Sequence, residues 1–154
     1  MRRLSGFLMI AAILLVPAVF IGHDTARAQS QALTFEGDTA ILTVAIKPDK
    51  TADFDQIMAD VRTALMKYEK PERKQQAAGW KVVKGNTPMK DGSVVYMHVI
   101  EPVVKGADYT ILAILYEANP DPAAQRALFE KYKAAFAANL GGGAFTTAVD
   151  LSKQ

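Results

Sequence analysis

Residues 79–102, GWKVVKGNTPMKDGSVVYMHVIEP, constrain the fold most, because they have the pattern of two strands joined by a turn. The segments 80–84 and 93–101 carry β-branched and aromatic residues, and the connection between them is rich in glycine, asparagine, proline and aspartate. Two strands connected in this way pair antiparallel. The predicted hairpin also holds the only tryptophan, Trp80, and one of the two histidines, His98.

The amino-terminal segment has the three parts of a secretory signal peptide. Arg2 and Arg3 give a positive start, an uninterrupted apolar run covers 7–21, and Ala28 ends a small-x-small pattern. Because the apolar run is short for a membrane span, we expect a signal peptide over 1–28, cleaved after Ala28, rather than an uncleaved anchor. The expected product is periplasmic or secreted, not held in a membrane, with a flexible lead-in over 29–38 and a single domain over 39–154.

Charge and cysteine usage exclude several classes of protein. The chain has 18 basic and 16 acidic residues, and the predicted leader contains three of the basic and one of the acidic ones, so the remainder carries no formal net charge. No basic cluster is interleaved with aromatic residues, so we expect no nucleic-acid partner. The chain has no cysteine, which excludes disulfides and thiolate metal sites. With His98 the only histidine after the leader, we expect no metal and no cofactor.

Two further elements precede the hairpin. Residues 39–47, TAILTVAIK, alternate in the manner of a strand, and Pro48 is expected to end it. Thr51 is the predicted N-cap of a helix whose apolar residues recur at helical spacing as far as Tyr68. Pro71 interrupts this pattern, and a further helical turn over 72–78 is predicted to stop at Gly79.

The segment 107–119, ADYTILAILYEAN, fits either a buried strand or a helix. We choose the helix, with Asp108 as N-cap and Pro120 beyond its end. A second helix is expected to begin with Asp121 as cap and to run to Leu140, where the glycines at 141–143 terminate it. The last predicted strand is 144–151.

This order of elements, β-α-β-β-α-α-β, predicts a ferredoxin-like α+β fold with helices on one face of an antiparallel sheet. We expect two aliphatic rows to meet the helices: Leu42, Val44 and Ile46, and Val95, Met97 and Val99. The second face would carry Tyr96 and His98 among mostly apolar neighbours, although a face in water should be polar. The pattern therefore predicts a homodimer through the open sheet face.

Three segments resemble those of uncharacterised secreted bacterial proteins: KPDKTADFDQIMADVRTAL, KPERKQQAAGWKV and VVYMHVIEPVVKGADYTILAILYEANP. This likeness covers most of the chain after the leader and implies no activity. The order, the size and the partly apolar second face also resemble the dimeric α/β-barrel superfamily, in which two ferredoxin-like units pack sheet against sheet. Its members include antibiotic-biosynthesis-type monooxygenases and chlorite-dismutase-like haem proteins. None of their catalytic motifs is matched residue by residue.

Candidate site residues are the histidine and the aromatic residues near the hairpin. His98 could act as a general base or a haem-iron ligand, but a histidine hydrogen-bonded at a subunit interface is the commoner situation. The candidates for lining a ligand pocket are Trp80, Tyr96, His98, Tyr109 and Tyr116.

The sequence favours a non-enzymatic, dimeric, periplasmic protein that binds a small apolar or aromatic molecule or a protein partner. The alternative is a cofactor-independent monooxygenase or isomerase of the dimeric-barrel type, with His98 as base and Tyr96 orienting the substrate. The two differ in geometry, since the enzyme requires both side chains in one cavity of ligand size.

Overall fold

A computed structural model describes residues 31–152 as an α+β fold with a four-stranded antiparallel sheet. The strands are β1 (Thr39–Ile46), β2 (Trp80–Lys84), β3 (Val94–Ile100) and β4 (Phe136–Phe145). The helices are α1 (Thr51–Lys67), α2 (Pro71–Gly79), α3 (Ile111–Ala118) and α4 (Pro122–Ala135), with a short 3₁₀ turn, η1 (Pro48–Lys50), before α1. The predicted signal peptide lies outside the described residues.

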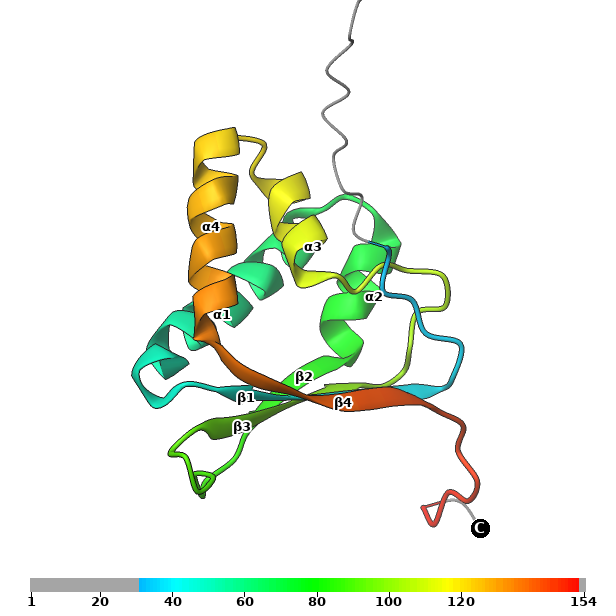
Figure 1. The fold of residues 1–154 in the computed structure, drawn as a ribbon. Coiled ribbons are helices and arrows are strands. Elements are labelled where there is room, and N and C mark those ends of the chain that lie inside the picture. The colour runs from blue at the N-terminus through cyan, green and yellow to red at the C-terminus, as the bar shows by residue number, and fades with distance from the viewer. Residues whose placement is uncertain (1–30, 153–154) are drawn as a thin grey trace, which may run out of the picture. The chain divides into compact units, whose positions relative to one another are not determined.

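The sheet has the order β2-β3-β1-β4, so the hairpin strand β3 and the first strand β1 lie at its centre. Figure 1 shows α1, α2, α3 and α4 all on one face of this sheet, with none of the described helices on the other. The two faces are called here the helix-covered face and the open face. This arrangement confirms the α+β class and the antiparallel sheet with helices on one side.

Helix α1 supplies the largest share of the core beneath the helices. Its stripe at i, i+3, i+4 spacing is buried against the sheet and the other helices. The buried positions are Phe54, Ile57, Val61, Ala64 and Leu65. Lys50 rather than Thr51 is its N-cap, because the η1 turn leads directly into the helix. Among the described residues, no helix has both the length and the apolar character needed to cross a membrane.

The side chains of β3 face the opposite way from the prediction. Leu42 pairs with His98 and Val44 with Tyr96, and directly opposed residues of an antiparallel pair point to the same face. Tyr96, His98 and Ile100 therefore join the Leu42 row under the helices and are buried. The expectation that the aliphatic row at 95, 97 and 99 meets the helices is wrong. The helix layer packs against the aromatic row, and the aliphatic row lies on the open face.

The chain after α4 also differs from the prediction. The helix expected to run to Leu140 ends at Ala135, and the strand expected over 144–151 lies at Phe136–Phe145, so the 141–143 glycines are inside a strand. The reason is close packing of β4 on β1: a Cβ at Gly142 would overlap the carbonyl oxygen of Ile41 and lie 2.8 Å from Leu42 Cα. Gly141 adopts φ +92° at an irregularity in the β1–β4 register.

The ambiguous segment is helical, as predicted, but α3 begins later, at Ile111. Asp108 does not cap the helix directly; its carboxylate accepts a hydrogen bond from the Thr110 amide at 2.9 Å. The same carboxylate accepts one from the Leu33 amide at 3.0 Å, and the Tyr109 amide donates to the Leu33 carbonyl at 2.8 Å. The part of the expected flexible lead-in that is described thus lies hydrogen-bonded along the 108–110 segment, and Phe35 is buried.

Candidate functional site

A cavity of about 670 Å³ lies between the helix-covered face and the helices. Its floor is formed by sheet residues, which are Leu42, Val44, Trp80 and His98. Its walls come from the segment before α3 and from the junction of α4 with β4, and include Tyr109, Ile111, Tyr132 and Phe136. Leu33 and Asn139, both at the surface, are part of its rim. The volume is typical of a site for a small organic molecule.

His98 is held by a single side-chain hydrogen bond in the described part of the chain. Its Nδ1 accepts from the Trp80 indole Nε1–H at 3.2 Å. The imidazole is 3% exposed, and burial lowers the pKa of His98 to about 4. The ring is therefore neutral at pH 7, because a buried charge without a counter-ion is costly.

The aromatic rings around His98 form a continuous packed set. Trp80 lies 5.8 Å from the His98 ring and 5.5 Å from the Tyr109 ring, measured between centroids. Phe54 of α1 lies edge-on to His98 at 6.1 Å. Such tilted and edge-to-face contacts restrict ring rotation. Trp80, His98 and Tyr109, which all line the cavity, are thus part of one packed set of rings.

The part of the lining at the junction of α4 with β4 is also aromatic. Tyr132 of α4 packs on Phe136 at 4.8 Å between centroids, and burial raises the pKa of Tyr132 to about 12. Its hydroxyl is therefore neutral and able to donate. It has no hydrogen-bond partner among the described residues, and no Asp, Glu, Lys or Arg belongs to the cavity lining. The cavity offers apolar surface and neutral donors, not charge.

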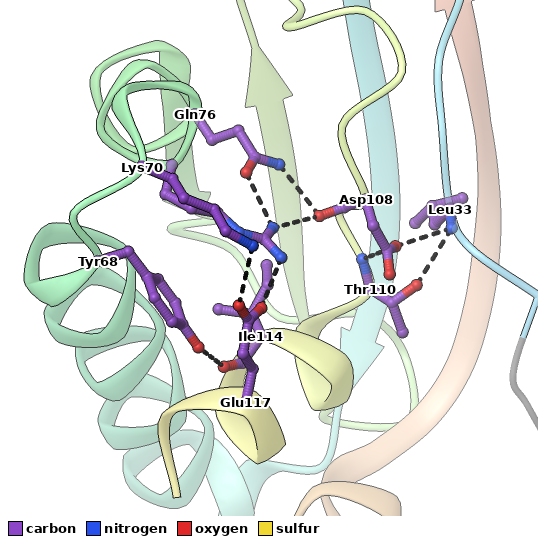
Figure 2. A network of polar contacts seen from close by, with 9 residues as sticks. Leu33, Tyr68, Lys70, Gln76, Asp108, Thr110, Ile114 and Glu117 are labelled. Carbon is purple, nitrogen blue, oxygen red and sulfur yellow. Dashed lines mark hydrogen bonds and ion pairs between the residues drawn. The ribbon is translucent and has the colours of Figure 1, made fainter.

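A polar network holds the wall that carries Tyr109 (Figure 2). The Arg73 guanidinium on α2 donates to the Asp108 carbonyl and to Gln76 Oε1, each at 3.0 Å, and pairs with the Glu117 carboxylate at 2.8 Å. Gln76, itself fully buried, donates to the same Asp108 carbonyl. Because Tyr109 directly follows Asp108, these contacts fix its backbone beside the cavity. The Tyr109 hydroxyl accepts from the Val104 amide at 2.8 Å.

The structure brings three of the five proposed ligand-binding residues to this cavity: Trp80, His98 and Tyr109. Tyr96 is not part of its lining; its hydroxyl donates to Asp55 at 2.7 Å, and Lys84 lies over its ring. Tyr116 is on α3, half-buried and also outside the lining. The described residues contain no group of three or more acidic or histidine side chains arranged to hold a metal ion.

Sequence reasoning missed the contribution of Tyr132, Phe136, Leu42 and Val44. A signal for the first two existed, since they lie in the apolar stripe of the predicted helix. The spacing of that stripe predicts only a buried helix face, and the helix is expected to continue through Phe136. The two aliphatic residues are on the face predicted to meet helices, where nothing in a sequence distinguishes core from cavity wall.

Three smaller cavities adjoin α1, of which one, of about 400 Å³, is lined by α1 residues alone and includes Arg62 and Lys67. A second, of about 340 Å³, lies between α1, α2 and β2, and a third, of about 280 Å³, lies between α1, α3 and α4. The third includes Asp60 and Lys67, and the second Arg62, whereas the largest cavity has no charged lining residue. The largest cavity is therefore the one suited to an apolar molecule.

Comparison of the chain with known protein families, with curated proteins and with solved structures found no match.

Proposed function

We propose that this protein is a non-enzymatic binding protein that takes a small apolar or aromatic molecule into the cavity beneath its helices. The observation that carries the proposal is the cavity itself, about 670 Å³ and walled by Trp80, His98, Tyr109, Tyr132 and Phe136. The cavity is open to the surface on the side of Leu33 and Asn139, so a ligand can enter it. A volume of this size, with an aromatic lining and a few polar groups, has the character of a ligand site.

The polar groups support binding more than catalysis. A general base is most effective when its pKa is near the working pH, and burial lowers the pKa of His98 to about 4. Its Nδ1 is already engaged by Trp80, and Tyr96 is hydrogen-bonded to Asp55 away from the cavity. These contacts weigh against the alternative, a cofactor-independent monooxygenase or isomerase in which His98 is the base and Tyr96 orients the substrate.

We propose further that the protein is a homodimer joined through its open face. The side chains there alternate with the buried row and are mostly apolar: Ile41, Val83, Val95, Met97 and Val99, with Phe145 at the edge. Val83 is 49% exposed and Phe145 51%, and the other four are partly exposed. Apolar residues adjoining in this way are typical of an interaction surface. Lys81 is the charged residue of the paired β2–β3 positions on this face, so little like-charge repulsion opposes a two-fold contact.

The strand order supports a ferredoxin-like unit as the subunit of that dimer. In the split βαβ fold the first and third strands are central and the second and fourth are at the edges, as in β2-β3-β1-β4. Two such sheets packed face to face would form a dimeric α/β barrel. The leader predicted at 1–28 supports a periplasmic or secreted location for this dimer.

Titration with Nile red, an uncharged dye that fluoresces in apolar sites, tests the binding function. Val44→Trp fills the cavity, and Val83→Trp is its matched control, the same change on the open face. We expect the wild type and Val83→Trp to bind the dye, and Val44→Trp to bind at least about tenfold more weakly. Leu42→Phe adds less volume to the cavity, and it serves as the second cavity variant if Val44→Trp does not fold. Equal binding by wild type and both cavity variants would refute the proposal.

A further inference from the structure

We infer that the ligand is an uncharged aromatic carbonyl compound whose oxygen accepts a hydrogen bond from the Nε2–H of His98. This inference rests on the proposed function, because it concerns the content of the same cavity. It is carried by the tautomer of one side chain, by an unused donor and by the absence of charge from the lining.

The Trp80 contact sets the tautomer of His98. An indole N–H can only donate, so Nδ1, which lies 3.2 Å from it, is the acceptor. A neutral imidazole then carries its single proton on Nε2. Trp80 is itself held between the rings of His98 and Tyr109. The direction of the donor is therefore fixed by the fold and not by the ligand.

The Nε2–H has no acceptor in the described part of the chain. The Trp80 bond is the only side-chain hydrogen bond that His98 makes there, and the residue is 97% removed from solvent. Arg73 Nε is the one fully buried side-chain nitrogen or oxygen without a partner among the described residues, so Nε2 of His98 keeps some accessible surface. A donor in such a confined position is most often paired, with protein or with ordered water, and a ligand oxygen can take the place of that water. Since His98 lines the cavity, an acceptor carried by the ligand would satisfy this donor.

The lining restricts the charge of the ligand. No lysine or arginine is present to pair with a carboxylate, and no aspartate or glutamate to pair with an ammonium group. Transfer of an unpaired charge into such surroundings is strongly unfavourable. The neutral Tyr132 hydroxyl, on a second lining residue, also has no hydrogen-bond partner in the described part of the chain. Neutral donors facing aromatic surface suit a ketone or quinone oxygen on a flat apolar body.

Three probes that share one skeleton test the inference by displacement of Nile red: benzophenone, diphenylmethane, which lacks the oxygen, and benzophenone-4-carboxylate, which adds a charge. We expect benzophenone to bind about three- to tenfold more tightly than diphenylmethane, the value of one buried hydrogen bond. The carboxylate should bind at least about tenfold more weakly than benzophenone.

Variants assign the preference to His98. His98→Phe keeps the ring but has no donor, so benzophenone and diphenylmethane should bind it equally. Trp80→Phe leaves Nδ1 free and should reduce the preference. Tyr96→Phe, a neighbour on β3 outside the cavity, should retain it. Long-range ¹⁵N NMR of wild-type protein should show His98 protonated at Nε2 with or without a probe bound, because the Trp80 contact sets the tautomer; the Nε2 signal should shift with benzophenone and not with diphenylmethane.

The outcomes separate this inference from the proposed function. Equal displacement by benzophenone and diphenylmethane, or tight binding of the carboxylate, would overturn the inference and leave a general apolar site. Failure of Nile red and all three probes to bind would overturn both. A proton found on Nδ1 of His98 would contradict the tautomer from which the argument starts.

Discussion

The indole nitrogen of Trp80 lies 3.2 Å from Nδ1 of His98, a contact between neighbouring strands across the helix-covered face. Trp80 is opposite Ile100 in the β2–β3 register, so its bond to His98 is diagonal across the hairpin. Large side chains can span that diagonal. This hydrogen bond therefore links β2 to β3 and also determines which nitrogen of His98 carries the proton.

The first prediction concerns the pH dependence of stability. Burial lowers the folded-state pKa of His98 to about 4, below the ordinary value of 6.5, so the unfolded chain binds the extra proton first as pH falls. The contribution of His98 to the free energy of unfolding is complete above pH 6.5 and decreases by about 3 kcal/mol by pH 4.

Urea unfolding at several pH values measures this change. His98→Gln, which does not titrate, is the control and should lack this part of the slope. An identical pH profile for wild type and His98→Gln would show that the histidine is not buried in a neutral form.

The second prediction concerns the close approach of β4 to β1. Gly142→Ala places a Cβ against the Ile41 carbonyl and the Leu42 backbone, neither of which can move without shifting a strand. We expect a loss of about 2 kcal/mol or more in the free energy of unfolding. Gly143→Ala is the matched control, since its added Cβ would meet only the Phe145 ring at 3.9 Å. Equal stability of the two variants in urea would contradict the strand pairing described here.

The third prediction concerns the Arg73 network. Arg73→Met removes hydrogen bonds to Gln76, Glu117 and the Asp108 carbonyl, and leaves buried Gln76 with fewer partners. We expect about 2–3 kcal/mol of destabilisation by thermal or urea unfolding. Nile red binding should also weaken, because the network holds the wall that carries Tyr109. Lys74→Met, an exposed position on the same helix, should stay within about 0.5 kcal/mol of wild type.

The fourth prediction tests the dimer. Val83→Glu and Phe145→Glu each introduce a charge at an exposed apolar position of the open face. In a two-fold contact both subunits carry this charge, so two copies of it would be buried in the interface. Either variant should raise the dissociation constant at least about 100-fold. Native mass spectrometry or sedimentation of wild type should give a dimer and these variants monomers.

Met66→Glu is the control for this change, because Met66 on α1 is equally exposed, at 55%, but lies away from the open face. A monomeric wild type at micromolar concentration would refute the dimer. It would leave the cavity, which is complete within one chain, unaffected.

Local signals in the sequence were sufficient for much of the fold. Alternation located β1, β2 and β3, helical spacing located α1, and Asp121 caps α4 as predicted, with its carboxylate accepting from the Ala123 and Ala124 amides. Each of these depends on residues close together in the chain. The choice of helix over strand for 107–119 was also correct at its core, Ile111–Ala118.

The failures involve contacts between distant segments. Which face of β3 meets the helices depends on its register with β1, because both faces are apolar enough to be buried. The three glycines at 141–143 are equally compatible with the end of a helix and with a strand packed closely on β1. Only the close approach of Gly142 to Ile41 distinguishes these two alternatives. Trp80, His98 and Tyr109 could be predicted as cavity-lining residues from their residue types alone. Tyr132 and Phe136 could not, because their place in the lining depends on where α4 ends and β4 begins.

Strand β3 carries two unrelated surfaces on alternate residues of one seven-residue segment. An insertion in the 85–93 connection would leave both surfaces intact, because loop length can change without altering strand phase. A single residue inserted between Tyr96 and Met97 would instead exchange them from that point on, sending His98 toward the open face and Met97 toward the helices. The length of the loop can therefore change without affecting either surface, whereas the number of residues within the strand cannot change by one.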